Sequence, residues 1–115
     1  MDVTLYHNPS CSHSRGALEL LTARGADLAV IEYLKHPPDR ATLQRIAAML
    51  EGPLADLVRK DKRFNELGLN SADYADKDAV IDLLLRHPEL MQRPIVIRGG
   101  RAVIARPAEK LLALF

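Results

Sequence analysis

Hydrophobic residues in the first third of the chain follow two different periods. Residues 3–6 (VTLY) form a short, mostly apolar run typical of a buried strand, and residues 28–34 (LAVIEYL) are rich in strand-favouring residues. Between them, residues 14–24 carry an apolar stripe at helical spacing, followed by Gly25 as a stop. The stripe consists of Ala17, Leu18, Leu20 and Leu21. Strand, helix and strand in this order predict a βαβ unit, whose two strands are parallel.

The middle of the chain has helical periodicity. Asp39 is a favourable N-cap for a helix that Gly52-Pro53 would end, and a second short helix would follow as far as Val58. Residues 61–75 are polar and irregular. Residues 77–86 show the stripe of another helix, ended by His87-Pro88. The side chains expected to face the core from this helix are Val80, Ile81, Leu84 and Leu85.

The end of the chain predicts a hairpin and a last helix. Residues 94–98 (PIVIR) and 102–105 (AVIA) have strand composition, and Gly99-Gly100 between them favours a tight turn. Pro107 would open a final helix carrying Leu111, Leu112 and Leu114. The order is βαβ, an inserted helical block, then ββα. This order predicts an α/β protein with a thioredoxin-like fold and a four-stranded mixed sheet. We expect a single domain, residues 1–115.

Composition narrows the class of protein. The chain has 115 residues, with 16 basic and 15 acidic residues that give a formal net charge of +1. That balance argues against nucleic-acid and membrane-surface binding, because both need a basic excess. The single cysteine fits a reducing compartment, and no signal-like or membrane-spanning run stands out. We therefore expect a cytoplasmic monomer with neither nucleic acid nor membrane as partner.

The single cysteine, Cys11, lies between the first predicted strand and the first predicted helix. Unpaired backbone N–H groups and the helix dipole favour a thiolate at a helix N-terminus, and Arg15 would add positive charge. In such places the pKa of a thiol falls by about 1 to 5 units from about 8.5. The alternative is a small buried apolar residue, which the polar, turn-forming flanks NPS and SHS disfavour. We therefore expect a reactive thiol.

The polar neighbours of Cys11 have alternative roles. Ser14 stands where many thioredoxin-like proteins carry the second cysteine of C-x-x-C, so dithiol exchange within the chain is impossible. Its hydroxyl could donate to the thiolate, cap the helix, or do both. His7 could act as a base or tune the thiolate, or be a histidine satisfied at a strand end. Asn8 could satisfy loop backbone or hold an oxyanion. No metal-ligand spacing links Cys11 to the remaining histidines, His13, His36 and His87.

The run from His7 to Arg15, His-Asn-Pro-x-Cys-x-x-Ser-Arg, closely resembles the arsenate reductases of the glutathione/glutaredoxin-coupled class. The resemblance continues in order along the chain, through YLKHPPDRATL, LVRK, RPIVI and ARPAEKLL. Matches over the full length are far more specific than one nine-residue motif. The chain stops at Phe115, whereas well-studied members of this class carry a longer C-terminal tail. It is therefore most similar to a short arsenate reductase-like subgroup.

The resemblance implies a set of site residues. Three arginines join the active-site cysteine in that family, and they match Arg59 of LVRK, Arg93 of QRPIVI and Arg106 of ARPAE. The implied catalytic residues are Cys11, Arg59, Arg93, Arg106 and His7, and the implied substrate-binding residues are Asn8, Ser14, Arg15 and the same three arginines. Several guanidinium forks would neutralise an arsenate and hold its arsenic in line with the sulfur. The resemblance also implies a cis peptide bond before Pro94.

The implied reaction reduces arsenate to arsenite through a Cys11–arsenic adduct. Glutathione is the implied co-substrate and glutaredoxin the implied partner, because one cysteine needs an external thiol for resolution. No bound cofactor and no metal are expected. A glutathione-dependent thiol reductase for another substrate is an alternative, which would need Cys11 but not all three arginines. A regulator of the Spx type, which binds RNA polymerase, is another, although Ser14 removes the C-x-x-C switch of those proteins.

Overall fold

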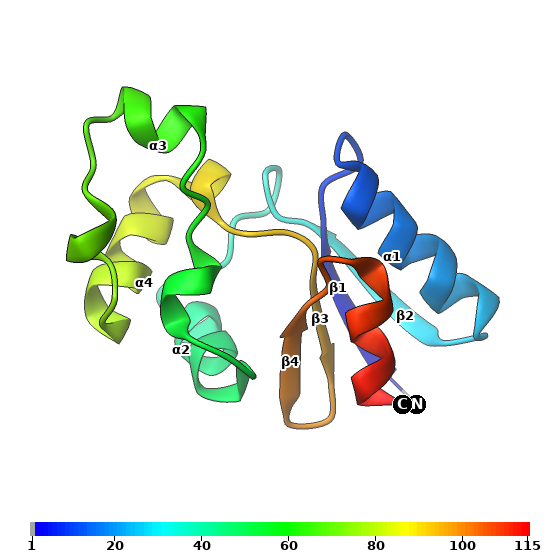
Figure 1. The fold of residues 1–115 in the computed structure, drawn as a ribbon. Coiled ribbons are helices and arrows are strands. Elements are labelled where there is room, and N and C mark those ends of the chain that lie inside the picture. Colours follow the sequence, from blue (N-terminus) through cyan, green and yellow to red (C-terminus); the bar gives the residue numbers. More distant parts are fainter. Residues whose placement is uncertain (1) are drawn as a thin grey trace.

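A computed structural model describes residues 2–115 (Figure 1). Four strands form one sheet in the order β2-β1-β3-β4. Strand β1 pairs in parallel with β2 and antiparallel with β3, which in turn pairs antiparallel with β4. The strands are β1 (Asp2–His7), β2 (Asp27–Glu32), β3 (Ile95–Arg98) and β4 (Arg101–Ile104). The sheet is therefore mixed, as the βαβ and ββα patterns predict.

Local capping explains where the helices of the middle segment begin. In three of them an aspartate at the N-cap accepts a hydrogen bond from the backbone N–H three residues on, a strongly preferred arrangement. These pairs are Asp39 with Thr42, Asp61 with Phe64 and Asp76 with Ala79. The helices are α1 (Ser12–Ala23), α2 (Arg40–Met49), α3 (Lys62–Glu66) and α4 (Lys77–Arg86). The 3₁₀ helices are η1 (Leu54–Leu57), η2 (Ser71–Asp73), η3 (Pro88–Leu90) and η4 (Ala108–Leu114).

The sheet separates two cores. Helices α2 and α4 lie on one side of it, and α1 and η4 lie on the other (Figure 1). Alternate side chains of a strand point to opposite faces, so β1 sends Tyr6 toward the helical block and Leu5 toward α1. The core on the side of α2 and α4 also contains Tyr33, Ile46, Leu84 and Ile95. The core on the side of α1 and η4 also contains Ala17, Leu21, Val96 and Leu111. No helix within residues 2–115 is long and apolar enough to cross a bilayer.

The predicted fold class is confirmed, and several element bounds need correction. Strand β2 ends at Glu32, because the chain turns there and the N–H of Lys35 bonds back to the Glu32 carbonyl. The segment predicted to be irregular, 61–75, contains α3 and η2, which start at side-chain caps. The last helix is a 3₁₀ helix, and Leu112, which was expected in the core, is 40% exposed. By contrast, α4 has the predicted bounds.

Candidate active site

Cys11 is the N-cap residue of α1, as the sequence predicts. The loop that carries it is closed by a hydrogen bond from the Cys11 N–H to the Asn8 carbonyl, at 3.0 Å. The Asn8 side chain is buried and accepts from the N–H of Ser10 at 3.0 Å. Among the described residues no side chain caps α1, so the unpaired N–H groups of its first turn are directed at the thiol. This arrangement favours negative charge on sulfur.

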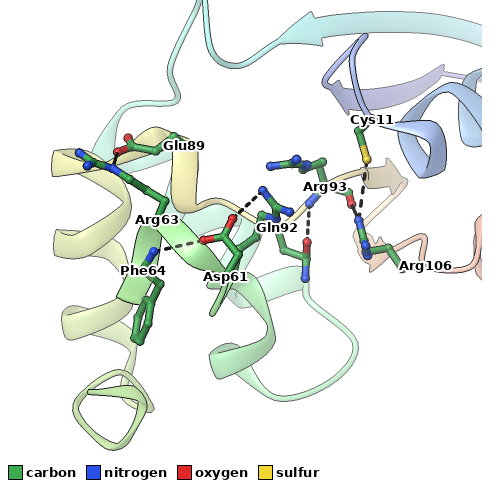
Figure 2. A network of polar contacts seen from close by, with 9 residues as sticks. Cys11, Asp61, Arg63, Phe64, Glu89, Gln92, Arg93 and Arg106 are labelled. Atoms are coloured by element: carbon green, nitrogen blue, oxygen red, sulfur yellow. Dashed lines mark hydrogen bonds and ion pairs between the residues drawn. The ribbon is translucent and has the colours of Figure 1, made fainter. Parts of the chain in front are cut away.

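The electrostatics of the site favour the thiolate. Burial of Cys11 acts to raise the pKa of its thiol, because a low-dielectric surrounding disfavours charge. The backbone N–H groups of Ser14 and His13 and the guanidinium of Arg93 outweigh burial and lower the pKa of Cys11 to about 7. Arg106 also faces the thiol, with Nη1 at 3.8 Å from Sγ (Figure 2). A large fraction of Cys11 is therefore ionised at neutral pH.

Backbone pairing brings the arginines together from three separate segments. Arg59 follows η1, Arg93 precedes β3 and Arg106 follows β4. A short bridge joins the first two segments, since Arg59 N–H bonds the Leu90 carbonyl and Gln92 N–H bonds the Leu57 carbonyl, both at 2.7 Å. The Arg106 guanidinium donates to the Arg93 carbonyl at 3.0 Å (Figure 2). Residues far apart in sequence thus form one positive cluster beside the thiol.

The peptide bonds before two prolines of this cluster are cis. The Arg93-Pro94 bond is cis, as the family resemblance implies. The Arg106-Pro107 bond is also cis, and neither the sequence pattern nor the resemblance predicts it. Both bonds directly follow an arginine of the cluster.

The positive charges of the arginine cluster repel one another, as the pKa of Arg59 shows. Burial and the charge of Arg93 lower the pKa of Arg59, while Asp61 opposes this shift. Asp61 lies 3.0 Å from Arg59 Nη1 and is the only carboxylate paired with that guanidinium in the part of the chain that the structure describes. Because one carboxylate faces three guanidiniums, the cluster keeps a positive excess. A multiply charged oxyanion would offset this repulsion.

His7, Ser14 and Asn8 form a separate buried group next to the thiol loop. The His7 Nδ1 lies 2.6 Å from the Ser14 Oγ, which also accepts from the Asn8 N–H at 3.0 Å. Burial lowers the pKa of His7, with Glu32 opposing and Arg15 adding to the shift, so the ring is neutral at neutral pH. The Ser14 hydroxyl is engaged by these two neighbours rather than by sulfur. Ser14 acts on the thiol through its backbone N–H.

The structure does not place Arg15 with the other three arginines. Its side chain is exposed, and Nη1 donates to the Pro9 carbonyl at 3.0 Å. This contact braces the loop that carries the thiol. Of the residues named from the sequence, the structure brings Arg93 and Arg106 to Cys11, and it places Arg59 close to these two arginines. Asn8 lies buried at the base of the same loop.

Sequence reasoning missed Tyr33. This side chain is fully buried, and its charge environment includes Arg93, Arg59 and Asn8. The pattern assigned it to the interior of a strand, as one more apolar position. The order of the elements nevertheless indicates that Tyr33 lies near Cys11, because the carboxyl ends of parallel strands share one edge of a sheet, where ligands bind. Cys11 follows β1 and Tyr33 follows its parallel neighbour β2.

A polar groove adjoins the cluster on the side of Arg106. Its volume is about 420 Å³, and Leu50, Val58, Val103 and Ile104 contribute apolar walls. Charged or amide side chains of both signs line the rest, namely Glu51, Asp56, Lys60, Gln92, Arg106 and Lys110. A groove of this kind suits a small molecule that carries both carboxylate and ammonium groups.

Known proteins resemble the chain over its whole length. A model of the ArsC family matches residues 6–114. An arsenate reductase of Neisseria meningitidis is 40% identical over 115 residues, covering 98% of this chain and 97% of the relative. An arsenate reductase of Escherichia coli is 37% identical over 114 residues, covering 98% and 80%. The solved structure of an arsenate reductase from Vibrio cholerae superposes with a TM-score of 0.89 at 35% identity, covering 100% and 98%.

Proposed function

The chain belongs to the ArsC family, and we propose on that premise that it reduces arsenate to arsenite through the Cys11 thiolate. The observation that carries the proposal is that Arg93 and Arg106 face one thiol whose pKa is about 7, with Arg59 close to both of these arginines. Arsenate is anionic at neutral pH, so it repels a thiolate until its oxygens are neutralised. Guanidinium forks provide that neutralisation and orient the anion.

The first step is attack of the Cys11 sulfur on arsenic(V). The S–As bond forms, one As–O bond breaks, and the oxygen leaves as water after protonation. Arg106 and Arg93 are positioned to stabilise negative charge on the remaining oxygens, because both face the thiol. Arsenic keeps its oxidation state in this step. The electrons for reduction come from thiols that follow.

Resolution needs two external thiols, because Cys11 is the only cysteine of the chain. Glutathione condenses with the adduct and a second water leaves. A glutaredoxin thiolate then attacks the glutathione sulfur, a disulfide forms, and the As–S electron pair reduces arsenic(V) to arsenic(III). Hydrolysis of the remaining S–As bond releases arsenite and regenerates the Cys11 thiol. Since reduced glutathione is required, the enzyme works in the cytoplasm.

The groove beside Arg106 is the place we assign to glutathione. Glutathione carries two carboxylates and one ammonium group, and the groove presents Lys60 and Lys110 together with Asp56. Its volume of about 420 Å³ accommodates a tripeptide. The thiol of glutathione would then approach the arsenic from the side of Arg106.

The proposal is tested by arsenate-dependent NADPH oxidation, coupled through glutathione reductase, glutathione and glutaredoxin. We expect turnover in the wild type and none in Cys11→Ser. Arg93→Ala and Arg106→Ala should lose most activity, whereas Arg86→Ala, which alters an exposed arginine at the end of α4, should not. A wild type without arsenate-dependent turnover would refute the proposal. Arginine variants with full activity would favour simple thiol exchange instead.

A further inference from the structure

Tyr33 is a buried polar residue with no assigned role in the reaction described above. Its side chain has 0% exposure, and within residues 2–115 its hydroxyl makes no hydrogen bond of good geometry, although Arg93 and Asn8 lie close enough to lower its pKa as donors. Buried hydroxyl groups almost always have a partner, so an unpaired one calls for an explanation. The packing around the ring is apolar, since Tyr33 belongs to the core between the sheet and the helical block.

Tyr33 lies at the edge of the sheet that carries the thiol loop, next to groups of the thiol site. His7 of β1 pairs with Glu32 of β2, so Tyr33 and Asn8 follow their strands at the same edge of the sheet. Asn8 belongs to the loop that carries Cys11, and it is one of the groups that act on the Tyr33 hydroxyl. The other groups are the guanidiniums of Arg93 and Arg59. Tyr33, Arg93 and Arg59 thus form one wall of the thiol site.

The wall has an excess of hydrogen-bond donors. Burial raises the pKa of Tyr33 more than Arg93 and Arg59 lower it, so the phenol keeps its proton. The Nε of Arg93 is a second buried donor without a partner in the described residues. A guanidinium has donors and no acceptor, whereas a phenol oxygen can accept from a guanidinium and still donate its own proton. A ligand with several acceptor atoms would therefore give these donors the hydrogen-bond partners that they lack.

We propose that the Tyr33 hydroxyl donates a hydrogen bond to the tetrahedral oxyanion that the arginines hold. A tetrahedral oxyanion presents acceptor oxygens in several directions, so one ligand can meet both Arg93 Nε and Tyr33. Arsenate, phosphate and sulfate share this geometry. The proposal deepens the proposed function by adding a substrate-binding residue to the same site. Anion binding at Tyr33 can nevertheless be measured without any turnover.

The test compares Tyr33→Phe with Tyr6→Phe. Tyr6 is 6% exposed in the same core, but its charged neighbours are Arg45 and Asp39. Tyr6→Phe therefore removes one hydroxyl from the same core without affecting Arg59, Arg93 or Arg106. The readout is protection of Cys11 against iodoacetamide by arsenate, phosphate or sulfate. We expect the anion concentration for half-protection to rise about 10- to 100-fold in Tyr33→Phe, as for loss of a charged hydrogen bond. Tyr6→Phe should stay within about twofold.

Two further readouts separate binding from packing. Without anion, the Tm of Tyr33→Phe should stay close to that of the wild type, because the removed hydroxyl makes no hydrogen bond of good geometry. In turnover, the KM for arsenate should rise while the KM for glutathione stays unchanged. Wild-type anion affinity in Tyr33→Phe would overturn the proposal, as would a wild type that no anion protects. A wild type that binds anions but does not turn over arsenate would overturn the proposed reaction and leave the role of Tyr33 intact.

Discussion

The charge state of Cys11 depends on a few groups that surround its sulfur. Two backbone N–H groups and the Arg93 guanidinium outweigh burial and bring the pKa to about 7. Thiolate is the reactive form, so reactivity should rise with pH through neutrality and fall away below it. The same groups that would bind a substrate thus also prepare the nucleophile.

We predict that alkylation of Cys11 by iodoacetamide follows a titration with a midpoint near pH 7, as the pKa of about 7 requires. Arg93→Gln should move the midpoint upward by about 1 pH unit, because a nearby opposite charge that favours the thiolate is lost. Rates measured between roughly pH 5 and 10 give both midpoints. Arg86→Gln is the control and should leave the midpoint unchanged. Equal midpoints in the Arg93 variant and wild type would contradict the role of Arg93.

The Ser14 hydroxyl connects two candidate site residues, His7 and Asn8, through one oxygen atom. It is 0% exposed, and its Oγ contacts both the His7 ring and the Asn8 N–H. Ser14→Ala should lower the free energy of unfolding by about 1–3 kcal/mol, since it leaves buried polar groups without a partner. Denaturant unfolding measures this loss. Ser12→Ala, at an exposed position of the same helix, should change the stability by less than about 0.5 kcal/mol. Equal stability of the two variants would show that the Ser14 contacts are unimportant.

At the scale of elements, the short helix α3 holds an arginine of the site. The carboxylate of Asp61 accepts from the Phe64 N–H at 3.2 Å and pairs with Arg59 at 3.0 Å. The cap and the ion pair therefore share one side chain (Figure 2). A short helix in a segment whose sequence pattern predicts irregular chain thus holds the carboxylate that pairs with the Arg59 guanidinium.

We predict different outcomes for two substitutions of Asp61. Asp61→Ala loses the cap and should cost about 1 kcal/mol of stability, whereas Asp61→Asn keeps a good cap and should cost much less. Both variants release Arg59, so both should raise the KM for arsenate severalfold. Unfolding curves and steady-state kinetics separate the two effects. A normal KM in both variants would mean that Arg59 needs no anchor.

Periodicity and capping explain which element bounds the sequence predicts correctly. Tertiary contacts determine the features that it does not predict. Helix α4 has both a clear apolar stripe and an aspartate cap, and its predicted bounds are right. Strand β2 was predicted too long, because the apolar pattern continues into the turn that carries Tyr33. The three arginines were named from the family resemblance. The proximity of Arg59 and Arg93 depends on the bridge between Val58 and Met91, which no local pattern reveals.

At the scale of the whole molecule, the site joins all three parts of the fold. Cys11 comes from the βαβ unit, Arg59 from the helical block, and Arg93 and Arg106 from the ββα unit. The hairpin is also tied to the rest, since Arg101 donates to Glu51 and to the Ala113 carbonyl. Any loss of packing between these parts should therefore separate the arginines from the thiol.

The C-terminal helix η4 gives a direct test of this dependence. Leu111 is 0% exposed in the core that α1 and η4 share, whereas its neighbour Leu112 is 40% exposed. Leu111→Ala should lower the free energy of unfolding by about 2–5 kcal/mol, because it removes transfer energy and leaves a cavity. Leu112→Ala should change it by less than about 0.5 kcal/mol.

Activity should follow stability in this pair, because η4 begins two residues after Arg106. With rising temperature, Leu111→Ala should lose arsenate turnover at the temperature where it unfolds, while Leu112→Ala should behave as the wild type. Denaturant unfolding and the coupled assay over the same temperatures measure both properties. If Leu111→Ala were destabilised as expected and yet lost turnover well below its Tm, η4 would be orienting Arg106 locally. Loss of both together means that global packing holds the site.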